Sequence, residues 1–170
     1  FARYTGSSLY ARKNFADLER YCVGYTNIDM PGIRGSDDFR QVTAGPDLFD
    51  LAAAAVRDAT GQEGRCEKRV RAWDQSFQNM GISSFLIWSS VLPPGSPYRT
   101  GGGNMPWWWH TEADTEEYCD PEILAKDTAV YLTGLSRLLG GDLPDVPVLW
   151  RAVRDRLSAI EVASNGTLDL

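Results

Sequence analysis

The chain has 170 residues, of which 43% are hydrophobic and 24% are charged, with a formal net charge of -6. This composition is typical of a globular protein, and the length is sufficient for one domain with a sizeable core. The negative charge argues against nucleic acids and anionic membranes as partners, and no apolar run reaches the roughly 18 residues of a membrane span.

The first predicted elements are a helix and a strand. Residues 8–20 show the apolar periodicity of a helix, with Leu9, Phe15 and Leu18 directed toward the core. The β-branched and aromatic residues of 21–30 then predict a buried strand that ends near Asp29.

The middle of the chain is expected to be mainly helical. Residues 46–60 predict a strong helix, which Pro46 and Asp47 open and Gly61 closes. The charged run 61–69 is interpreted as a surface loop, and 75–81 as a short helix capped by its last glycine.

The last part begins with a second buried strand at 82–92, followed by a proline- and glycine-rich loop at 93–106. Amphipathic helices are predicted at 121–139 and at about 146–163. Strands that alternate with helices indicate an α/β protein with a sheet flanked by helices. Because ligands bind at the carboxyl ends of such strands, Asp29 and His110 are expected to share a site.

A carboxylate and an imidazole are good zinc ligands, so Asp29 and His110 form a candidate metal site. Each also has a structural interpretation. From local sequence, Asp29 before Pro-Gly is more typical of a residue that caps its own turn. His110, the only histidine, follows three tryptophans and is more typical of a packed or hydrogen-bonded side chain.

The run Trp107–Trp109 predicts either an aromatic wall of a substrate pocket or a mixture of core filling and loop closure. The acidic run 112–118 is typical of a solvated entry to the following helix. The three cysteines are odd in number and lack metal-type spacing, which favours unpaired thiols and leaves one disulfide as the alternative.

Three stretches in register resemble the zinc-dependent exopeptidases of the bacterial aminopeptidase and glutamate carboxypeptidase type, a group related to glutaminyl cyclase and the transferrin receptor ectodomain. "GSSLYARKNFADLERYCVGYTNIDMPG" is similar to the family's "GS..Y" segment, helix and strand ending in an N-x-D turn. "DQSFQNMGISSFLIW" resembles its "DH..F...GIP" helix and strand, and "WWWHTEADTEEYCDPEIL" resembles its "HT..D" motif. The resemblance covers roughly residues 4–139.

The resemblance implies that residues 1–170 are the C-terminal part of one catalytic domain with a mixed central β-sheet flanked by helices. It implies that Asp29 and His110 are ligands of one or two zinc ions. Thr111 and Asp114 would stand behind His110, where Asp114 holds the ligand loop by hydrogen bonds. The family hydrolyses amides with a metal-activated water and a general-base Glu, and that Glu is expected upstream of this chain, so these residues alone are expected to be inactive.

Some positions depart from the family pattern. Gln75 replaces the His of "DH", Ser83 stands where Pro is favoured, and Trp109 stands where many peptidases have Tyr before the ligand His. A Trp at this place also occurs in glutaminyl cyclase.

The leading hypothesis is a hydrolase of small peptides or N-acyl amino acids, completed by the rest of the domain or by another subunit. Trp107–Trp109 would line its pocket beneath the loop 99–104, and Arg99 would bind a substrate carboxylate. The alternatives are a glutaminyl cyclase-like acyltransferase and a non-catalytic binding module that resembles the transferrin receptor. The sequence does not indicate a compartment.

Overall fold

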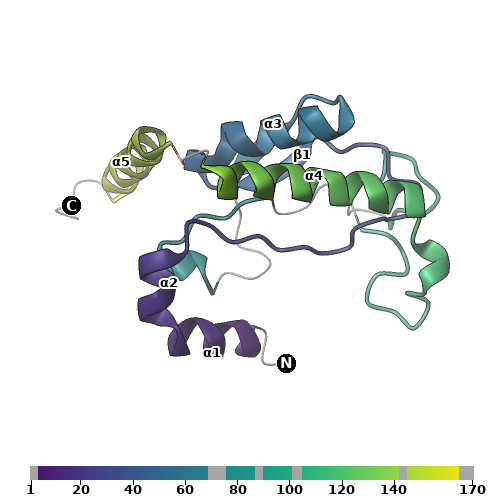
Figure 1. Cartoon of the computed structure of the whole chain (residues 1–170), viewed down its shortest axis with the longest axis horizontal. Helices are drawn as coiled ribbons and strands as arrows, with labels where there is room; N and C mark the ends of the chain where they lie inside the picture. The colour runs from purple at the N-terminus through teal and green to yellow at the C-terminus, as the bar shows by residue number, and fades with distance from the viewer. Residues whose placement is uncertain (1–3, 69–75, 87–89, 101–104, 142–144, 165–170) are drawn as a thin grey trace.

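The computed structural model describes residues 4–68, 76–86, 90–100, 105–141 and 145–164 (Figure 1). Its elements in chain order are α1 (Thr5–Lys13), α2 (Phe15–Tyr21), β1 (Gln41–Ala44), η1 (Pro46–Leu48), α3 (Phe49–Thr60), β2 (Arg65–Lys68), η2 (Gln78–Met80), η3 (Glu116–Tyr118), α4 (Pro121–Gly140) and α5 (Val146–Ala163). None of the helices in these ranges is long and apolar enough to cross a membrane.

The centre of the molecule is a small sheet extended by bridged segments. β1 and β2 pair in parallel, with Val42 opposite Cys66. Residues 84 and 91 pair with residues 45 and 38 in the antiparallel sense. The amide of Gly45 donates to the carbonyl of Ser84 at 2.8 Å, and the amide of Val91 donates to the carbonyl of Asp38 at 2.7 Å. On its other side, Ser84 forms a parallel bridge with Tyr25. The arrangement is therefore mixed, and the predicted α/β character is confirmed.

The predicted strands 21–30 and 82–92 are mainly extended segments joined by single bridges, and residues 87–89 lie outside the described ranges. The prediction of a loop over 61–69 is wrong for residues 65–68, which form β2. The physical reason is alternation: Arg65 is exposed while Cys66 packs against the core, which suits a charged strand at a sheet edge.

α3 and α4 contact each other and supply half of the buried residues in the main core cluster (Figure 1). The predicted helix over 46–60 begins with the 3-10 turn η1 at Pro46 and becomes α-helical only from Phe49. It is capped as predicted by Gly61, whose φ of 73° is left-handed. α4 begins as predicted after Asp120, whose carboxylate accepts hydrogen bonds from the amides of Glu122 and Ile123. Its buried stripe is Ile123, Asp127, Val130, Tyr131 and Gly134. This stripe packs on Phe85 and Leu86 of the sheet as well as on α3.

The predicted N-terminal helix is divided into α1 and α2 at Asn14, whose side-chain amide donates to the carbonyl of Tyr10 at 2.8 Å. Leu9 is 41% exposed and Phe15 is 49% exposed, so the prediction that both face the core is wrong within the described residues. Leu18 is half-buried. The hydroxyls of Ser7 and Ser8 instead bond to Ser76, and these contacts attach α1 to the turn before η2. The prediction that residues 8–20 are helical is confirmed, apart from the break at Asn14. Leu9 and Phe15 on its apolar face are nevertheless exposed among the described residues.

α5 confirms the predicted last helix. Asp145 caps it by accepting a hydrogen bond from the amide of Val148, and its first turn contacts η1. The remainder projects from the body (Figure 1). No α5 residue is buried, and Trp150 is 69% exposed.

Candidate functional site

A cavity of about 280 Å³ lies between the turn that follows Asp29 and the segment 106–119. We call it the aromatic cavity. Four of the predicted site residues line it, namely Asp29, Trp108, Trp109 and Asp114. The remaining lining residues are Met30, Pro31, Gly32, Ile33, Pro106, Thr115, Tyr118 and Cys119. The fold therefore brings together two segments that are about eighty residues apart in the sequence.

Asp29 is placed by the parallel bridge at Tyr25 and by the turn that follows. The amide of Tyr25 donates to the carbonyl of Ser83 at 3.0 Å, which directs the chain along the sheet toward the cavity. Asp29 is exposed there, and its carboxylate accepts no hydrogen bond from any described residue. The alternative in which Asp29 caps its own turn therefore lacks its expected hydrogen bond.

Gly32 fixes the end of this turn against α4. It has φ of 79°, and a Cβ atom would lie 2.9 Å from Cβ of Leu124. Its amide donates to Oδ2 of Asp127 at 2.7 Å, and its carbonyl accepts from the amide of Asp120 at 2.8 Å. A larger residue at this position would push the Asp29 turn away from α4.

Asp127 is a supporting residue that the sequence reasoning missed. Its side chain is 0% exposed, and it accepts hydrogen bonds from the amide of Gly32 and from the hydroxyl of Ser90, the latter at 2.9 Å. A carboxylate within the apolar stripe of the predicted helix 121–139 was the signal, since buried acids require partners. Asp127 thus connects α4 to both strand-end segments beside the cavity.

The tryptophan run contributes both to a core cluster and to the wall of the cavity. Trp108 is 3% exposed and stacks on Tyr118, with ring centroids 4.2 Å apart, in a small cluster with Ile33 and Leu92. Trp107 and Trp109 are exposed. One indole therefore fills a core while also lining the cavity, and Trp109 forms the outer part of the wall.

His110 lies beside the aromatic cavity and does not line it. Its ring stacks on Trp109, with centroids 3.8 Å apart and an interplanar angle of 20°, and it is exposed. Its backbone has φ of 61°, in the left-handed region that only a tight turn imposes on such a residue. The side chain of His110 forms no hydrogen bond with a described residue. It is therefore a stacked side chain whose ring nitrogens remain available.

Thr111 holds the turn that presents His110. Its hydroxyl donates to the carbonyl of Trp108 at 2.7 Å and accepts from the amide of Ala113 at 3.2 Å. Asp114 continues this turn through its own amide, which donates to the carbonyl of Thr111 at 3.3 Å. The Asp114 side chain lines the cavity, and no described hydrogen bond joins it to His110.

Tyr118 is the cavity residue with a perturbed ionisation. Burial raises its pKa, and the nearby Glu117 carboxylate raises it further. Both effects favour the protonated phenol.

The described residues do not by themselves complete a zinc site. No group of three or more His, Cys, Asp or Glu side chains gathers in the ranges that the structure covers. Asp29 and His110 supply two donors, and a zinc site in a protein requires at least three protein ligands. All three cysteines are free, as the sequence favoured, so none is paired in a disulfide.

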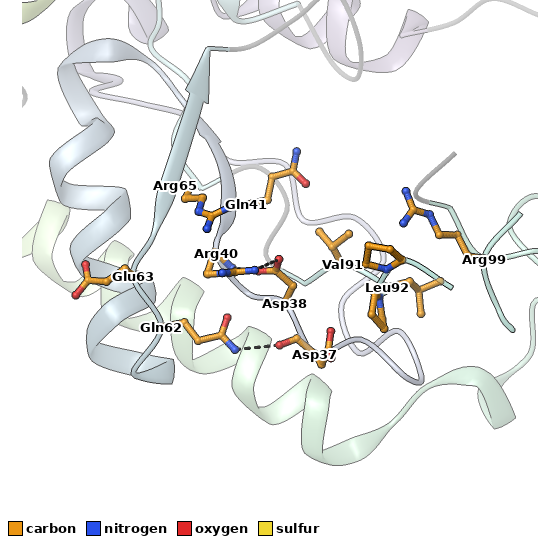
Figure 2. A pocket seen from close by; sticks show the side chains of 12 residues that line it. Asp37, Asp38, Arg40, Gln41, Gln62, Glu63, Arg65, Val91, Leu92 and Arg99 are labelled. Carbon is orange, nitrogen blue, oxygen red and sulfur yellow. Dashed lines mark hydrogen bonds and ion pairs between the residues drawn. The ribbon is translucent and has the colours of Figure 1, made fainter. Parts of the chain in front are cut away.

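Arg99 does not line the aromatic cavity, although its backbone forms an antiparallel bridge with Pro106, which does. Arg99 lines a second, larger cavity together with residues of β1 and the start of β2 (Figure 2). The glycine-rich loop predicted to cover the pocket falls largely on residues 101–104, and these residues and Gln75 lie outside the described ranges.

Comparisons with known proteins give one structural likeness. No protein-family model matches the chain, and no curated protein matches it. Among solved structures, an aminopeptidase from Aneurinibacillus sp. strain AM-1 superposes with a TM-score of 0.59 at 21% sequence identity. The match covers 79% of this chain but 30% of that one, so the chain spans less than a third of the aminopeptidase. The chain therefore has a peptidase-like fold.

Proposed function

We propose that the chain is part of a zinc-dependent hydrolase that cleaves amide bonds of small peptides or N-acyl amino acids. The observation that carries the proposal is the placement of Asp29 on the aromatic cavity, with His110 stacked on Trp109 of the same wall. Both are metal-binding side chains without hydrogen bonds to described residues. The likeness to an aminopeptidase fold supports the same reaction class.

In this proposal each residue has one role. Asp29 and His110 bind zinc, and the ligands that complete the site come from residues beyond those described. Thr111 positions the His110 turn, and Asp114 lies on the cavity wall behind it. Trp108 and Trp109 contact an apolar or aromatic side chain of the substrate. Bound zinc would supply Lewis-acid chemistry at the amide carbonyl.

The test combines metal analysis with hydrolysis assays on the full-length protein. Zinc content is measured by mass spectrometry, and hydrolysis is measured on aminoacyl p-nitroanilides and N-acetyl amino acids. We expect Asp29→Ala and His110→Ala each to weaken zinc binding at least roughly tenfold, because each removes a direct ligand. Both variants are expected to lose hydrolysis.

Glu161→Ala is the matched control, since Glu161 is an exposed acid on α5, outside both cavities. It should keep wild-type zinc content and rate. A folded protein that binds no zinc would overturn the proposal in favour of a binding module. Zinc-dependent cyclisation of N-terminal glutaminyl peptides without hydrolysis would replace the hydrolase with an acyltransferase.

A further inference from the structure

α5 carries an apolar stripe that remains exposed among the described residues. The side chains of Val146, Trp150, Val153 and Leu157 are 52%, 69%, 40% and 44% exposed. Half-buried Ile160 continues the same spacing, in which steps of four and three residues alternate. This spacing is the heptad repeat of a coiled coil, with Trp150 and Leu157 at the a positions and the other three residues at the d positions.

The body of the molecule holds α5 from a different side. The amide of Asp145 donates to the carbonyl of Asp47 at 2.7 Å, and the first turn of α5 contacts η1. Val148 and Ala152 are half-buried and lie on the side of the helix away from the stripe. The rest of α5 then projects from the body (Figure 1). The stripe is therefore open to another molecule.

Opposite charges flank the stripe at the two positions that pair between parallel coiled-coil helices. Arg156 occupies a g position, and Glu161 occupies the next e position. Both side chains are exposed, and neither forms an ion pair with another described residue. In a parallel pair of α5 helices, Arg156 of each copy would lie beside Glu161 of the other copy. An antiparallel pair with overlapping stripes would instead bring the two Arg156 side chains together.

We propose that α5 is an association helix, whose apolar stripe packs in parallel against the same stripe of a second copy of this chain. The flanking charges favour a second copy, because Arg156 and Glu161 become mutual partners when the helix meets itself in parallel. The body lies on a different side of α5, which leaves room for both copies. This association requires neither zinc nor the aromatic cavity, so it is independent of the hydrolase proposal.

The association is expected to be weak because the stripe is short. We expect a Kd of roughly 10–100 µM, since helices of this length are marginal on their own and the stripe spans few turns. Samples at low micromolar concentration then contain mainly monomer with the stripe exposed. β-branched residues at the d positions also suit bundles of more than two helices, so the measured mass decides how many copies associate.

The test is sedimentation equilibrium of the full chain from about 5 to about 500 µM, a range that brackets the expected Kd. EDTA excludes bridging metal ions, and a reductant excludes disulfides between the free cysteines. The wild type should pass from monomer to dimer as the concentration rises. Leu157→Glu should raise the Kd at least roughly tenfold, because it places a charge in the apolar seam. Circular dichroism should show unchanged helix content, since Leu157 is exposed in the monomer.

The charge pairs test the orientation of the helices. Arg156→Glu should raise the Kd roughly threefold or more, because it replaces two attractive contacts with repulsive ones. The double variant Arg156→Glu/Glu161→Arg should restore the wild-type Kd, since it exchanges the two charges. Arg151→Glu is the matched control, because it makes the same charge change on an exposed residue away from the stripe. It should associate as the wild type does.

Two results would overturn the proposal as a whole. One is a chain that stays monomeric over the whole concentration range, and the other is an unchanged Kd in Leu157→Glu. A Kd that rises in Leu157→Glu but not in Arg156→Glu would overturn the parallel arrangement, because antiparallel helices exchange one like-charge contact for another in that variant.

Discussion

α4 and α5 are similar helices with different surroundings. They have 20 and 18 residues, each begins after a capping aspartate with a proline in the first turn, and each carries an apolar stripe. α4 buries its stripe against α3 and the sheet, whereas α5 buries no residue along its length. The difference lies in the neighbours, since the local sequence makes both helices equally well.

This contrast separates helix formation from burial. Caps and periodicity act within a few residues, so they predict where a helix begins and ends. Burial needs a second surface from elsewhere in the chain or from another molecule, and most helical stability in proteins comes from that packing. Leu9 of α1 and Phe15 of α2 resemble the residues of α5, because they lie on helices and yet their apolar side chains are exposed.

The largest effect is expected from Asp127, which joins α4 to the site. Asp127→Ala would leave the buried amide of Gly32 and the hydroxyl of Ser90 without their acceptor. We expect the free energy of unfolding to fall by about 3 kcal/mol, because each unsatisfied buried group costs roughly 1–3 kcal/mol. Urea unfolding followed by circular dichroism measures this loss.

Asp127→Asn is the matched variant, because its amide oxygen can still accept one hydrogen bond. It should lose clearly less stability than Asp127→Ala. Equal stability of the alanine variant and the wild type would show that Asp127 does not hold α4 to the sheet.

A matched pair of valines tests the contrast between the two helices directly. Val130 is fully buried on α4, and Val153 is exposed on α5. Val130→Ala should lower the free energy of unfolding by about 2 kcal/mol, through lost apolar burial and the space left behind. Val153→Ala should change it by less than about 0.5 kcal/mol. A similar loss in both variants would mean that the Val153 face of α5 is buried in solution, so that α4 and α5 would not differ in burial.

The smallest effect concerns Cys66, on the strand that α3 covers. Burial raises its pKa from an ordinary value near 9.0 to about 11, and its thiol donates to the carbonyl of Phe49 at 3.1 Å. Between these two pH values the folded state keeps a proton that the unfolded state loses. The thiol's contribution to stability is therefore complete below pH 9.0 and falls as the pH rises toward 11.

At pH 9 the Cys66 thiol should react with iodoacetamide more slowly in buffer than in urea, since only the thiolate is reactive. Mass spectrometry of the labelled peptides measures both rates. Between pH 9 and 11, the Cys66→Ala variant should lose less stability than the wild type, because it lacks this thiol. Labelling at the same rate in both conditions would place Cys66 outside the packed layer.

The elements that could be predicted are those with local signals. Asp120-Pro121 and Gly61 mark their helix ends in the sequence, and the structure agrees. β2 was missed because its charges resemble a loop, and its partner β1 lies more than twenty residues earlier. Strand pairing over such distances depends on tertiary contacts that no local pattern contains.

The candidate site also combines features that local sequence signals predict with features that depend on tertiary contacts. Asp29 and Trp108 were predicted at one site and line one cavity, because strand ends and loops at a sheet edge gather in a regular way. His110 stacks on Trp109 instead of lining the cavity, and its backbone is left-handed with φ of 61°; no local pattern in the sequence indicates either feature. Arg99 was assigned to the tryptophan pocket, yet the turns after Pro93 place it with β1 and β2. Zinc binding by Asp29 and His110 stays a prediction.

The buried carboxylate of Asp127 has a consequence for genetics. It holds the Gly32 turn, which follows Asp29, by accepting a hydrogen bond from one amide. A screen that scored only lost activity would rank Asp127 alongside the proposed ligands, although its side chain is buried and holds the turn by a hydrogen bond. Temperature would distinguish the two classes. Alleles at Asp127 should be heat-sensitive and partly active when grown cool. Under the zinc proposal, alleles at Asp29 should be inactive at every temperature.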